Sequence, residues 1–447
     1  MDSQLLLSEI AEMARGQLIG ADIKVDGFTT DTRQLKSSDL FIALAGEKYD
    51  GHDFIDAELS SQVKALFVHR EVDCALPKVL VEDTLKGLSR WATAWRCHVD
   101  PYVIAVTGSN GKTTVKQMLA SVFAQAGKTH STQGNLNNHI GVPLTLLRCE
   151  KDVEFAVIEM GANHIGEIDH LSRLVQPNIA IITNAGPAHL EGFGSLDGVA
   201  HGKGEIINGL QDMGHIILNA DDKYCAFWLQ KAEYLQALTF GFSQQADIRG
   251  VLDRQQLLVH MGEQELLINL PLPGRHNAYN ALAVIAAASV AGLSAQQICQ
   301  GLEQMQQASS RLEFKHSSQG AQIIDDSYNA NPASLKAAIE VLCAQSEQAW
   351  LVLGDMGELG AEEQSIHQQM GEFAKSAGIK KLFALGELSR YAVQGFGKGA
   401  IHFETYQQLS AVLAEQLTQD CSVLVKGSRS MHMEKIVDAL TQPQSLH

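Results

Sequence analysis

A glycine-rich segment lies between a run typical of a buried strand and a run typical of a helix, in the sequence VIAVTGSNGKTTVKQML from Val103 to Leu119. Glycines allow the backbone to turn its N–H groups toward a phosphate, and a lysine at the start of the helix can reach the β- and γ-phosphates of a nucleotide. A hydroxyl in the next position can contact Mg²⁺. We therefore predict that ATP with Mg²⁺ binds the loop residues Gly108, Ser109, Asn110, Gly111, Lys112, Thr113 and Thr114.

This loop departs from the common phosphate-loop pattern at one position. Val106 stands where the pattern G-x-x-x-x-G-K-[ST] has its first glycine, so the first glycine here, Gly108, comes two residues later. The alternative is a strand-to-helix turn that binds no nucleotide. The strand-like and helix-like flanks favour the nucleotide site, although the loop alone does not identify a reaction.

Three further polar residues follow later segments of the same region. Glu159 ends the run FAVIE, where a carboxylate can hold Mg²⁺ directly or through water. His189 lies in the turn-rich segment TNAGPAHLEGFGS, and Lys203 lies in the helix-like stretch HGKGEI. Taken singly, they are also compatible with a helix cap or surface acid, a polar loop residue and a solvated lysine. Their positions at successive strand ends favour a common site.

The composition limits the classes of protein to which the chain can belong. Of its 447 residues, 45% are hydrophobic and 19% charged, which is typical of globular domains. The formal charge of −17 argues against nucleic acid or an anionic membrane surface as a partner. The seven cysteines form no C-x-x-C pair and predict free thiols in a reducing compartment.

Neither a membrane span nor a signal peptide is expected. The apolar stretch Ala281 to Leu293 is too short to cross a bilayer. Acidic residues within Met1 to Gly16 predict an amphipathic helix instead of a signal peptide. We therefore expect a cytoplasmic protein without membrane insertion.

Changes in pattern divide the chain into three predicted domains. Residues 1–97 contain short apolar runs broken by polar loops, which favour a small mixed domain. Residues 98–310 and 311–447 each contain β-branched runs separated by helix-length segments, a pattern typical of parallel sheets covered on both faces. The predicted fold class is α/β, with a central ATPase domain of the phosphate-loop type and a C-terminal Rossmann-like domain. Ligands of such sheets bind beyond the carboxyl ends of the strands.

Several of these segments together resemble the Mur ligases, a family of ATP-dependent enzymes that form amide bonds in peptidoglycan synthesis. The resemblance rests on TGSNGKTT, the strand ending at Glu159, PAHLEGFGS and HGKGEI. In addition, GRHNAYNALA (Gly274 to Ala283) is similar to the family's H-N-x-x-N helix start, and SRLE (Ser310 to Glu313) to its domain-boundary arginine. LVLGDMGELG and VLVKGSRS are similar to loops of its third domain, so the resemblance covers essentially the whole chain.

The resemblance implies ATP and Mg²⁺ and assigns roles to particular residues. The implied catalytic residues are Lys112, Glu159, His189 and Lys203, the last carbamylated by CO₂. The first Mg²⁺ is expected on Thr113 and Glu159, and a second on His189. Further implied ATP contacts come from Asn277, Asn280, Arg311 and Asp326. The two asparagines are three residues apart, so they share a helix face and either contact the adenine edge or cap the helix.

Three other segments resemble the family members that join D-alanyl-D-alanine to UDP-N-acetylmuramoyl-tripeptide. Asp31 to Ile55 is similar to a uridine-nucleotide module, whose implied UDP contacts are Asp31, Arg33 and Gly46. Gly134 to Leu147 is similar to a substrate-side loop with Asn135 and Asn138. Ile323 to Leu342 is similar to the dipeptide signature, with Ser327, Tyr328, Asn329 and Asn331. Two cations after the last strand suit peptide carboxylates, namely Lys426 and Arg429. Asp31 and Arg33 could instead form a surface ion pair. The segment from Ser327 to Asn331 could be a simple Asx-rich turn, and Lys426 and Arg429 could be placed there by chance.

The implied reaction forms an acyl phosphate on the terminal carboxylate of the tripeptide, which the amine of D-Ala-D-Ala then attacks. Lys112 and Asp326 fall in different predicted domains, so we expect a hinge at Met305 to Arg311 that closes on ATP. The expected protein is a monomer. The sequence leaves open whether His189 or a water takes the proton of the amine, and whether the third residue of the tripeptide is diaminopimelate or lysine.

The sequence disfavours three alternatives to this interpretation. A sibling ligase that adds diaminopimelate or lysine, or a folylpolyglutamate synthetase, is disfavoured by the DDSYNANP loop and the uridine-type first domain. A phosphate-loop kinase or motor ATPase is disfavoured because the first glycine is missing and the second strand ends in Glu159. A non-catalytic nucleotide-binding relative is expected to have lost Lys112, Glu159 or His189, and all three are present.

Overall fold

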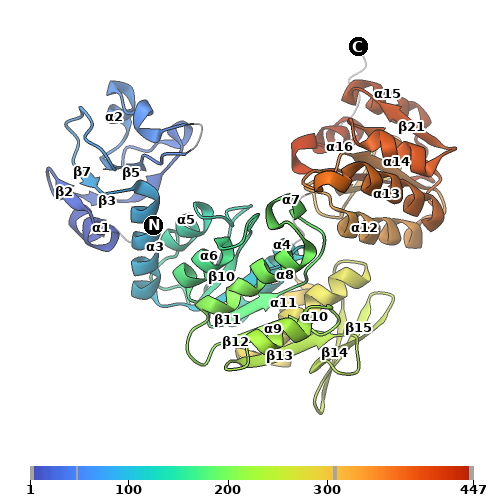
Figure 1. Ribbon diagram of the computed structural model, residues 1–447, viewed down its shortest axis with the longest axis horizontal. Helices are drawn as coiled ribbons and strands as arrows, with labels where there is room; N and C mark the ends of the chain where they lie inside the picture. Colours follow the sequence, from blue (N-terminus) through green and yellow to red (C-terminus); the bar gives the residue numbers. More distant parts are fainter. Residues whose placement is uncertain (1–4, 47–48, 306–309, 442–447) are drawn as a thin grey trace.

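The structure is a computed structural model that describes residues 5–46, 49–305 and 310–441. The chain forms three lobes in sequence order, with the central lobe between the N-terminal and C-terminal lobes (Figure 1). Each lobe has its own sheet covered by helices, which confirms the predicted α/β class. In the described part of the chain, no helix is both long and apolar enough to cross a bilayer.

The N-terminal lobe is built on a five-stranded sheet in the order β2-β7-β6-β5-β4. Four strands run parallel, and β2 is antiparallel to β7, so the sheet is mixed as predicted. The strands are β2 (Gln17–Ile19), β4 (Gly27–Thr29), β5 (Asp39–Ile42), β6 (Ala65–Val68) and β7 (Lys78–Leu80). Around them lie the strand pair β1 (Leu5–Leu6) and β3 (Lys24–Val25) and the helices α1 (Leu7–Ala14) and α2 (Ala57–Gln62).

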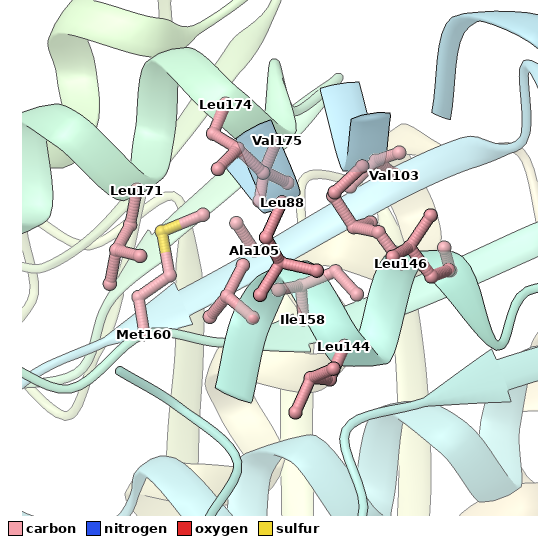
Figure 2. Close-up of a cluster of buried hydrophobic side chains, with 14 of the residues drawn as sticks. Leu88, Val103, Ala105, Leu144, Leu146, Ile158, Met160, Leu171, Leu174 and Val175 are labelled. Carbon is pink, nitrogen blue, oxygen red and sulfur yellow. The ribbon is translucent and has the colours of Figure 1, made fainter. Parts of the chain in front are cut away.

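Helix α3 (Thr84–Val99) joins the N-terminal lobe to the central lobe. Leu88, Trp91 and Trp95 are buried in one apolar cluster that contains residues of both lobes. The Trp95 indole N–H also donates to the carbonyl of Cys149 in the central lobe, at 2.9 Å. Figure 2 shows Leu88 among side chains of the central sheet and of α5 (Gly141–Leu147) and α6 (Glu167–Val175). The two lobes therefore share part of a continuous core.

The central lobe contains a nine-stranded sheet in the order β16-β15-β14-β13-β12-β11-β8-β10-β9. The strands from β9 to β14 pair in parallel. They are β8 (Tyr102–Thr107), β9 (Thr129–Ser131), β10 (Phe155–Glu159), β11 (Ile179–Ile182), β12 (His215–Asn219), β13 (Gln236–Gly241) and β14 (Ile248–Asp253).

An antiparallel extension of this sheet was not among the predicted elements. β15 (Gln256–Met261) and β16 (Gln264–Asn269) continue from β14 as two hairpins. In β16 the buried Leu266 and Ile268 alternate with exposed residues, which is the pattern of a strand with one face in water. These strands lack the unalternated apolar runs that predicted the rest of the sheet, so the sequence pattern did not reveal them.

Helices cover both faces of the central sheet. One face packs against α4 (Lys112–Phe123), α10 (Arg275–Val290) and α11 (Ala295–Glu303). The other face packs against α3, α5 and α6 and against the helices that follow β11 and β12. These are α7 (Leu190–Phe193), α8 (Leu196–Gly204) and α9 (Cys225–Lys231). The alternation of strand and helix places every β-to-helix loop at the carboxyl edge of the sheet.

The C-terminal lobe has a six-stranded sheet in the order β17-β18-β22-β19-β20-β21, which is parallel except for β17. Its strands are β17 (Glu313–His316), β18 (Gln322–Asp326), β19 (Ala349–Gly354), β20 (Lys381–Leu385), β21 (Ala400–Phe403) and β22 (Ser422–Lys426). Its helices are α12 (Pro332–Gln345), α13 (Glu363–Ala377), α14 (Ser389–Phe396), α15 (Tyr406–Gln416) and α16 (Glu434–Thr441). Of the predicted hinge, residues 306–309 lie outside the described part of the chain.

Candidate active site

A cavity of about 1200 Å³ lies between the central and C-terminal lobes. It is formed by loops at the carboxyl ends of β8, β10 and β11, by the start of α10 and by the loop between β18 and α12. Most of the predicted site residues line it: Ser109, Asn110, Gly111, Lys112, Thr113, Thr114, Asn135, Asn138, Glu159, His189, Asn277, Asn280, Arg311, Asp326, Tyr328, Asn329, Asn331, Lys426 and Arg429. Those that do not are Gly108, Lys203, Ser327 and the three residues of the N-terminal lobe, Asp31, Arg33 and Gly46.

The two glycines of the phosphate loop occupy positions that no other residue can take without strain. Gly108 has φ +147°, and a Cβ there would lie 1.9 Å from the Thr183 hydroxyl. Gly111 has φ +83°, and its Cβ would lie 2.4 Å from Oδ1 of Asn280. The loop is therefore packed against the neighbouring strand and against α10 through atoms that only glycine allows so close.

Lys112 begins helix α4 and is folded back over the loop. Its Nζ donates to the carbonyls of Gly108 at 2.7 Å and Ser109 at 3.3 Å. Burial lowers the pKa of Lys112 below its ordinary value; the charge of Glu159 opposes this and that of Arg311 adds to it. The ammonium thus has carbonyl partners that an incoming phosphate can replace.

Glu159 ends β10 as a buried carboxylate with partners on both oxygens. Oε1 accepts from Nδ2 of Asn137 at 2.8 Å, and Oε2 accepts from the Thr113 hydroxyl at 3.0 Å. The ammonium of Lys116 lies 3.3 Å from Oε2. The predicted Mg²⁺ ligands Thr113 and Glu159 are therefore adjacent, and their hydroxyl and carboxylate oxygens are the donors that this ion prefers.

His189 is the N-cap residue of α7 and contacts the C-terminal lobe's loop that follows β19. It adopts a left-handed backbone, φ +55°, and its Nδ1 is 2.5 Å from Oε2 of Glu358. The imidazole lowers the pKa of Glu358 below its ordinary value. Because the two residues belong to different lobes, this contact brings the predicted second metal ligand against the C-terminal lobe.

Lys203 is fully buried on α8 beneath the site. Its Nζ donates to the carbonyl of Ala162 at 3.3 Å and lies 4.9 Å from the ring centre of Phe193. Burial, reinforced by the charge of Lys112, lowers its pKa to about 7. A substantial fraction of the amine is thus neutral near physiological pH, although Lys203 does not itself line the cavity.

The asparagines of α10 are buried at the cavity wall and are already engaged. Nδ2 of Asn277 donates to the carbonyl of Pro273 at 2.8 Å, and Nδ2 of Asn280 donates to Oδ1 of Asn277 at 3.2 Å. His276 beside them has its pKa lowered to about 4, mainly by burial, and is therefore neutral at working pH. The nearest charges are Asp326 and Lys426, so α10 meets the C-terminal lobe at this point.

Asp326 and Lys426 form a largely buried ion pair at the ends of two adjacent strands, β18 and β22. Asp326 Oδ1 also accepts from the backbone N–H of Leu312 at 3.2 Å, and Lys426 Nζ donates to the carbonyl of Asn329 at 2.9 Å. Lys426, predicted to bind a substrate carboxylate, thus also holds the loop that follows β18.

In the loop that follows β18, the ring of Tyr328 lies near two guanidinium groups. The guanidinium of Arg311 lies 4.0 Å from the ring centre of Tyr328, and that of Arg429 lies 5.9 Å from it. Ser327 is buried and donates to Oδ1 of Asp325 at 2.6 Å, which shapes the loop from below. Cation–π contact of this kind holds both arginines at the mouth of the cavity.

Asn331 connects the two lobes while it caps a helix. Its Oδ1 accepts from the N–H of Ser334 at the start of α12, at 2.9 Å. Its Nδ2 donates to Oδ1 of Asn110 in the phosphate loop at 2.7 Å. Oδ1 of Asn331 therefore caps the helix, as the alternative of a simple Asx-rich turn before this helix predicts. Nδ2 of the same side chain contacts the phosphate loop.

The predicted uridine contacts lie in the N-terminal lobe, outside the cavity. Arg33 and Asp31 form a 2.8 Å ion pair, with the arginine side chain 86% exposed. The pair lowers the pKa of Asp31 to about 2. The N–H of Gly46 donates to the carbonyl of Tyr49 at 2.9 Å. An exposed pair of this kind contributes little to stability and leaves donors available to a ligand.

We expect Arg33→Ala to weaken binding of UDP by about tenfold, the loss of one charge-assisted hydrogen bond, without changing the melting temperature. Titration calorimetry with UDP and with ADP checks this expectation. ADP binding serves as the internal control because its predicted site is the cavity between the central and C-terminal lobes. Equal UDP affinity in the variant and the parent protein would remove Arg33 from the site.

Sequence reasoning missed four residues that the structure places at the site: Lys116, Asn137, His276 and Glu358. Lys116 is one helical turn after Lys112, so the i, i+4 spacing was available as a signal. Asn137 lies between the predicted contacts Asn135 and Asn138, both of which are exposed. Oδ1 of Asn138 accepts from the N–H of Gly141, the first residue of α5, at 2.8 Å.

Comparison with known proteins assigns the three lobes to one family. The profile described as "Mur ligase family, catalytic domain" matches residues 24–92, "Mur ligase middle domain" matches residues 106–288, and "Mur ligase, glutamate ligase domain" matches residues 310–429. These three segments correspond to the three sheets described above.

Relatives match over nearly the whole chain. The UDP-N-acetylmuramoyl-tripeptide–D-alanyl-D-alanine ligase of Escherichia coli is 41% identical, with 98% of each chain covered. The enzyme of the same name from Haemophilus influenzae is 39% identical, with 97% of each covered.

Solved structures of proteins named MurF are also similar to this chain along nearly its whole length. A crystal structure of MurF from Acinetobacter baumannii superposes with a TM-score of 0.91 at 33% identity, covering 97% of this chain and 98% of that one. MurF ligase from Thermotoga maritima in complex with ADP gives 0.82 at 26% identity, covering 92% and 96%. With the phosphate loop, the Glu159 site and the facing C-terminal loop in one cavity, and with this similarity along its length, the chain belongs to the Mur ligase family.

Proposed function

We propose that the protein is an ATP-dependent ligase that adds D-Ala-D-Ala to UDP-N-acetylmuramoyl-tripeptide, with ADP and phosphate as co-products. The observation that carries this function is the single cavity in which the phosphate loop of the central lobe faces the loop from Asp326 to Asn331. The full-length relatives are named for this reaction, and one related structure contains ADP. The product is the pentapeptide precursor of peptidoglycan.

The chemistry requires activation because a carboxylate is a poor electrophile at neutral pH. The terminal carboxylate oxygen of the tripeptide attacks the γ-phosphorus of ATP, which gives an acyl phosphate and ADP. The amine of D-Ala-D-Ala then attacks the acyl carbon, the C–O bond to phosphate breaks, and the amine loses a proton. Lys112 reduces repulsion between the anionic reactants in the first step.

Mg²⁺ fits the donors at Glu159 and Thr113, a buried carboxylate with an adjacent hydroxyl. When bound, it supplies charge neutralisation for the ATP phosphates. We propose that His189 holds a second ion through Nε2, the ring nitrogen that does not contact Glu358. Arg311 then faces the phosphates from the C-terminal lobe, and Asp326 accepts from the ribose of ATP.

The loop with Ser327, Tyr328, Asn329 and Asn331 is proposed to hold the dipeptide, and Lys426 and Arg429 the peptide carboxylates of the nucleotide substrate. Asp31, Arg33 and Gly46 hold its UDP group, and Asn135 and Asn138 face its peptide. We retain residues 1–97, 98–310 and 311–447 as the proposed domains. The seven cysteines are all unpaired, which supports action in the reducing cytoplasm. We also propose that the protein acts as a monomer.

The test is release of ADP and phosphate with all components present and with each omitted in turn. The proposal predicts that release requires ATP, Mg²⁺, UDP-N-acetylmuramoyl-tripeptide and D-Ala-D-Ala together. A free amino acid acting on a UDP-muramoyl dipeptide would instead identify a sibling ligase. Parallel reactions with diaminopimelate- and lysine-containing tripeptides identify the third residue.

Carbamylation of Lys203 is the prediction that depends most on pH. CO₂ reacts with a neutral amine, and a pKa of about 7 means that the neutral fraction of Lys203 grows as the pH rises from 6 to 8. Carbamylation replaces a cation near Lys112 with an anion and so relieves their repulsion. We expect activity to fall in CO₂-free buffer and to recover with bicarbonate, more fully at pH 8 than at pH 6.

Measurement of initial rates in degassed buffer, with and without added bicarbonate, checks this prediction. In Lys203→Ala, we expect low activity that bicarbonate does not change. Restoration of that variant by a short-chain carboxylic acid would support the role of a carbamate. Identical rates of the parent enzyme in both buffers at both pH values would contradict it.

A further inference from the structure

Lys116 is a buried lysine that the proposed reaction leaves without a role. It lies one helical turn beyond Lys112 on α4, and its side chain is 6% exposed. Its Nζ donates to the carbonyl of Gly134 at 3.1 Å and lies 3.3 Å from Oε2 of Glu159. A buried ammonium is costly unless it is paired, so these two contacts account for its position.

Through these contacts, both oxygens of Glu159 are connected to one short segment, Gly134–His139. Oε2 reaches Gly134 through Lys116, and Oε1 accepts directly from Asn137 at 2.8 Å. The carbonyl of Asn137 in turn accepts from the N–H of Gly161, just beyond the strand that ends in Glu159, at 2.8 Å. The segment faces the cavity with Asn135, Asn137, Asn138 and His139.

The Thr113 hydroxyl contacts Oε2 of Glu159 by a hydrogen bond and the Lys116 ammonium contacts it as an ion pair, and Mg²⁺ on that oxygen affects the two groups differently. The Thr113 hydroxyl is neutral, and its oxygen can turn a lone pair toward a metal ion. The Lys116 ammonium has no lone pair and is repelled by a divalent cation on the same oxygen. Its hydrogen-bond acceptor, the Gly134 carbonyl, is already 3.1 Å away. A small shift of the side chain away from Glu159 therefore leaves Lys116 bonded to Gly134 alone.

We propose that Lys116 is a positioning residue that couples the metal carboxylate Glu159 to the segment Gly134–His139. Metal binding strengthens the bond from Lys116 to Gly134 and fixes this segment in the form that receives the acceptor substrate. The inference rests on the proposed function, since it takes the segment to face the muramoyl peptide. Its consequence is that magnesium nucleotide and UDP-N-acetylmuramoyl-tripeptide bind cooperatively.

Titration calorimetry measures this coupling without turnover. The dissociation constant of UDP-N-acetylmuramoyl-tripeptide is determined with and without saturating Mg²⁺ and ADP. We expect Mg²⁺ and ADP to tighten it by about fivefold or more in the parent protein, the usual range for coupled sites. In Lys116→Met, which keeps the aliphatic stem and removes the ammonium, we expect less than about a twofold change.

Lys128→Met is the matched control. Lys128 is on the same lobe and pairs with Glu150 and Asp152, but its side chain is 45% exposed and lies outside the cavity. We expect its coupling to equal that of the parent protein. Should Lys116→Met fail to fold, Lys116→Gln is the second variant, because its amide can donate to Gly134 but carries no charge for Mg²⁺ to repel.

Hydrogen exchange of residues 133–139 tests the same link in the absence of any muramoyl nucleotide. We expect Mg²⁺ and ADP to slow exchange there in the parent protein and in Lys128→Met, but not in the Lys116 variants. Unchanged coupling and unchanged protection in those variants would overturn the role of Lys116. Parent protein that shows the protection but does not bind the muramoyl nucleotide would refute the proposed function while leaving the Lys116 link intact.

Discussion

Replacement of Lys112 by methionine is expected to lower kcat/KM for ATP by about a thousandfold, the scale at which loss of one preorganised electrostatic group acts. Its ammonium is the cation of the phosphate loop and is held 2.7 Å from the Gly108 carbonyl. Methionine keeps a comparable length and apolar stem, so the variant removes mainly the charge. The charge acts most strongly as negative charge redistributes over the transferred phosphoryl group, so kcat falls more than ADP affinity.

Two measurements and one control variant separate this effect from misfolding. The melting temperature and the affinity for UDP report on the fold and on the distant N-terminal lobe, and both are expected to remain close to those of the parent protein. Lys128→Met again controls for loss of one positive charge from the same lobe. A fall in kcat/KM of less than about tenfold would mean that Lys112 does not contact the reacting phosphate.

Replacement of Glu159 by glutamine is expected to lower kcat by about a hundredfold or more and to shift the Mg²⁺ requirement to higher concentration. The substitution is nearly isosteric, and the amide oxygen can still accept from Asn137 at the position of Oε1. What is lost is the negative charge next to Thr113 and Lys116, which leaves the Lys116 ammonium without its anionic partner. A site with fewer charges binds a hard divalent cation more weakly.

The decisive readout for this variant is the Mg²⁺ titration at fixed ATP. We expect the half-saturating Mg²⁺ concentration to rise by about tenfold, the loss of one charged ligand. Glu154→Gln, an acid just before the same strand and outside the cavity, provides a matched control. If Glu159→Gln and the control have the same titration curve as the parent enzyme, Glu159 is not the metal carboxylate.

Residues that belong to strand-to-helix loops were predictable from the sequence. The phosphate loop, Glu159 and Asp326 each follow a run of buried β-branched residues, and parallel topology brings all such strand ends to one edge. A run of buried β-branched residues therefore predicted the strand, and it also predicted that the polar residue at the end of the strand lies at the carboxyl edge of the sheet. The two larger sheets followed from the same runs, because apolar residues without alternation indicate strands buried on both faces. The N-terminal sheet followed from short apolar runs broken by polar loops.

Contacts between lobes were not predictable in this way. The pairing of His189 with Glu358, and of Asn110 with Asn331, depends on how two independently folded sheets face each other, which no local periodicity encodes. The strands β15 and β16 were missed because they bury only one face. Lys116 was missed because a lysine on a helix is ordinarily solvated, and only the tertiary structure places it beside Glu159.

The most direct test of the account follows a heavy oxygen atom through the reaction. The enzyme is incubated with ATP, Mg²⁺, D-Ala-D-Ala and UDP-N-acetylmuramoyl-tripeptide that carries oxygen-18 in its terminal carboxylate. The masses of the products are then measured by mass spectrometry. The account predicts UDP-N-acetylmuramoyl-pentapeptide and inorganic phosphate carrying one labelled oxygen, because the carboxylate oxygen that attacks ATP leaves with the phosphate. Pentapeptide formation with unlabelled phosphate would contradict the acyl phosphate, and absence of pentapeptide would contradict the ligase itself.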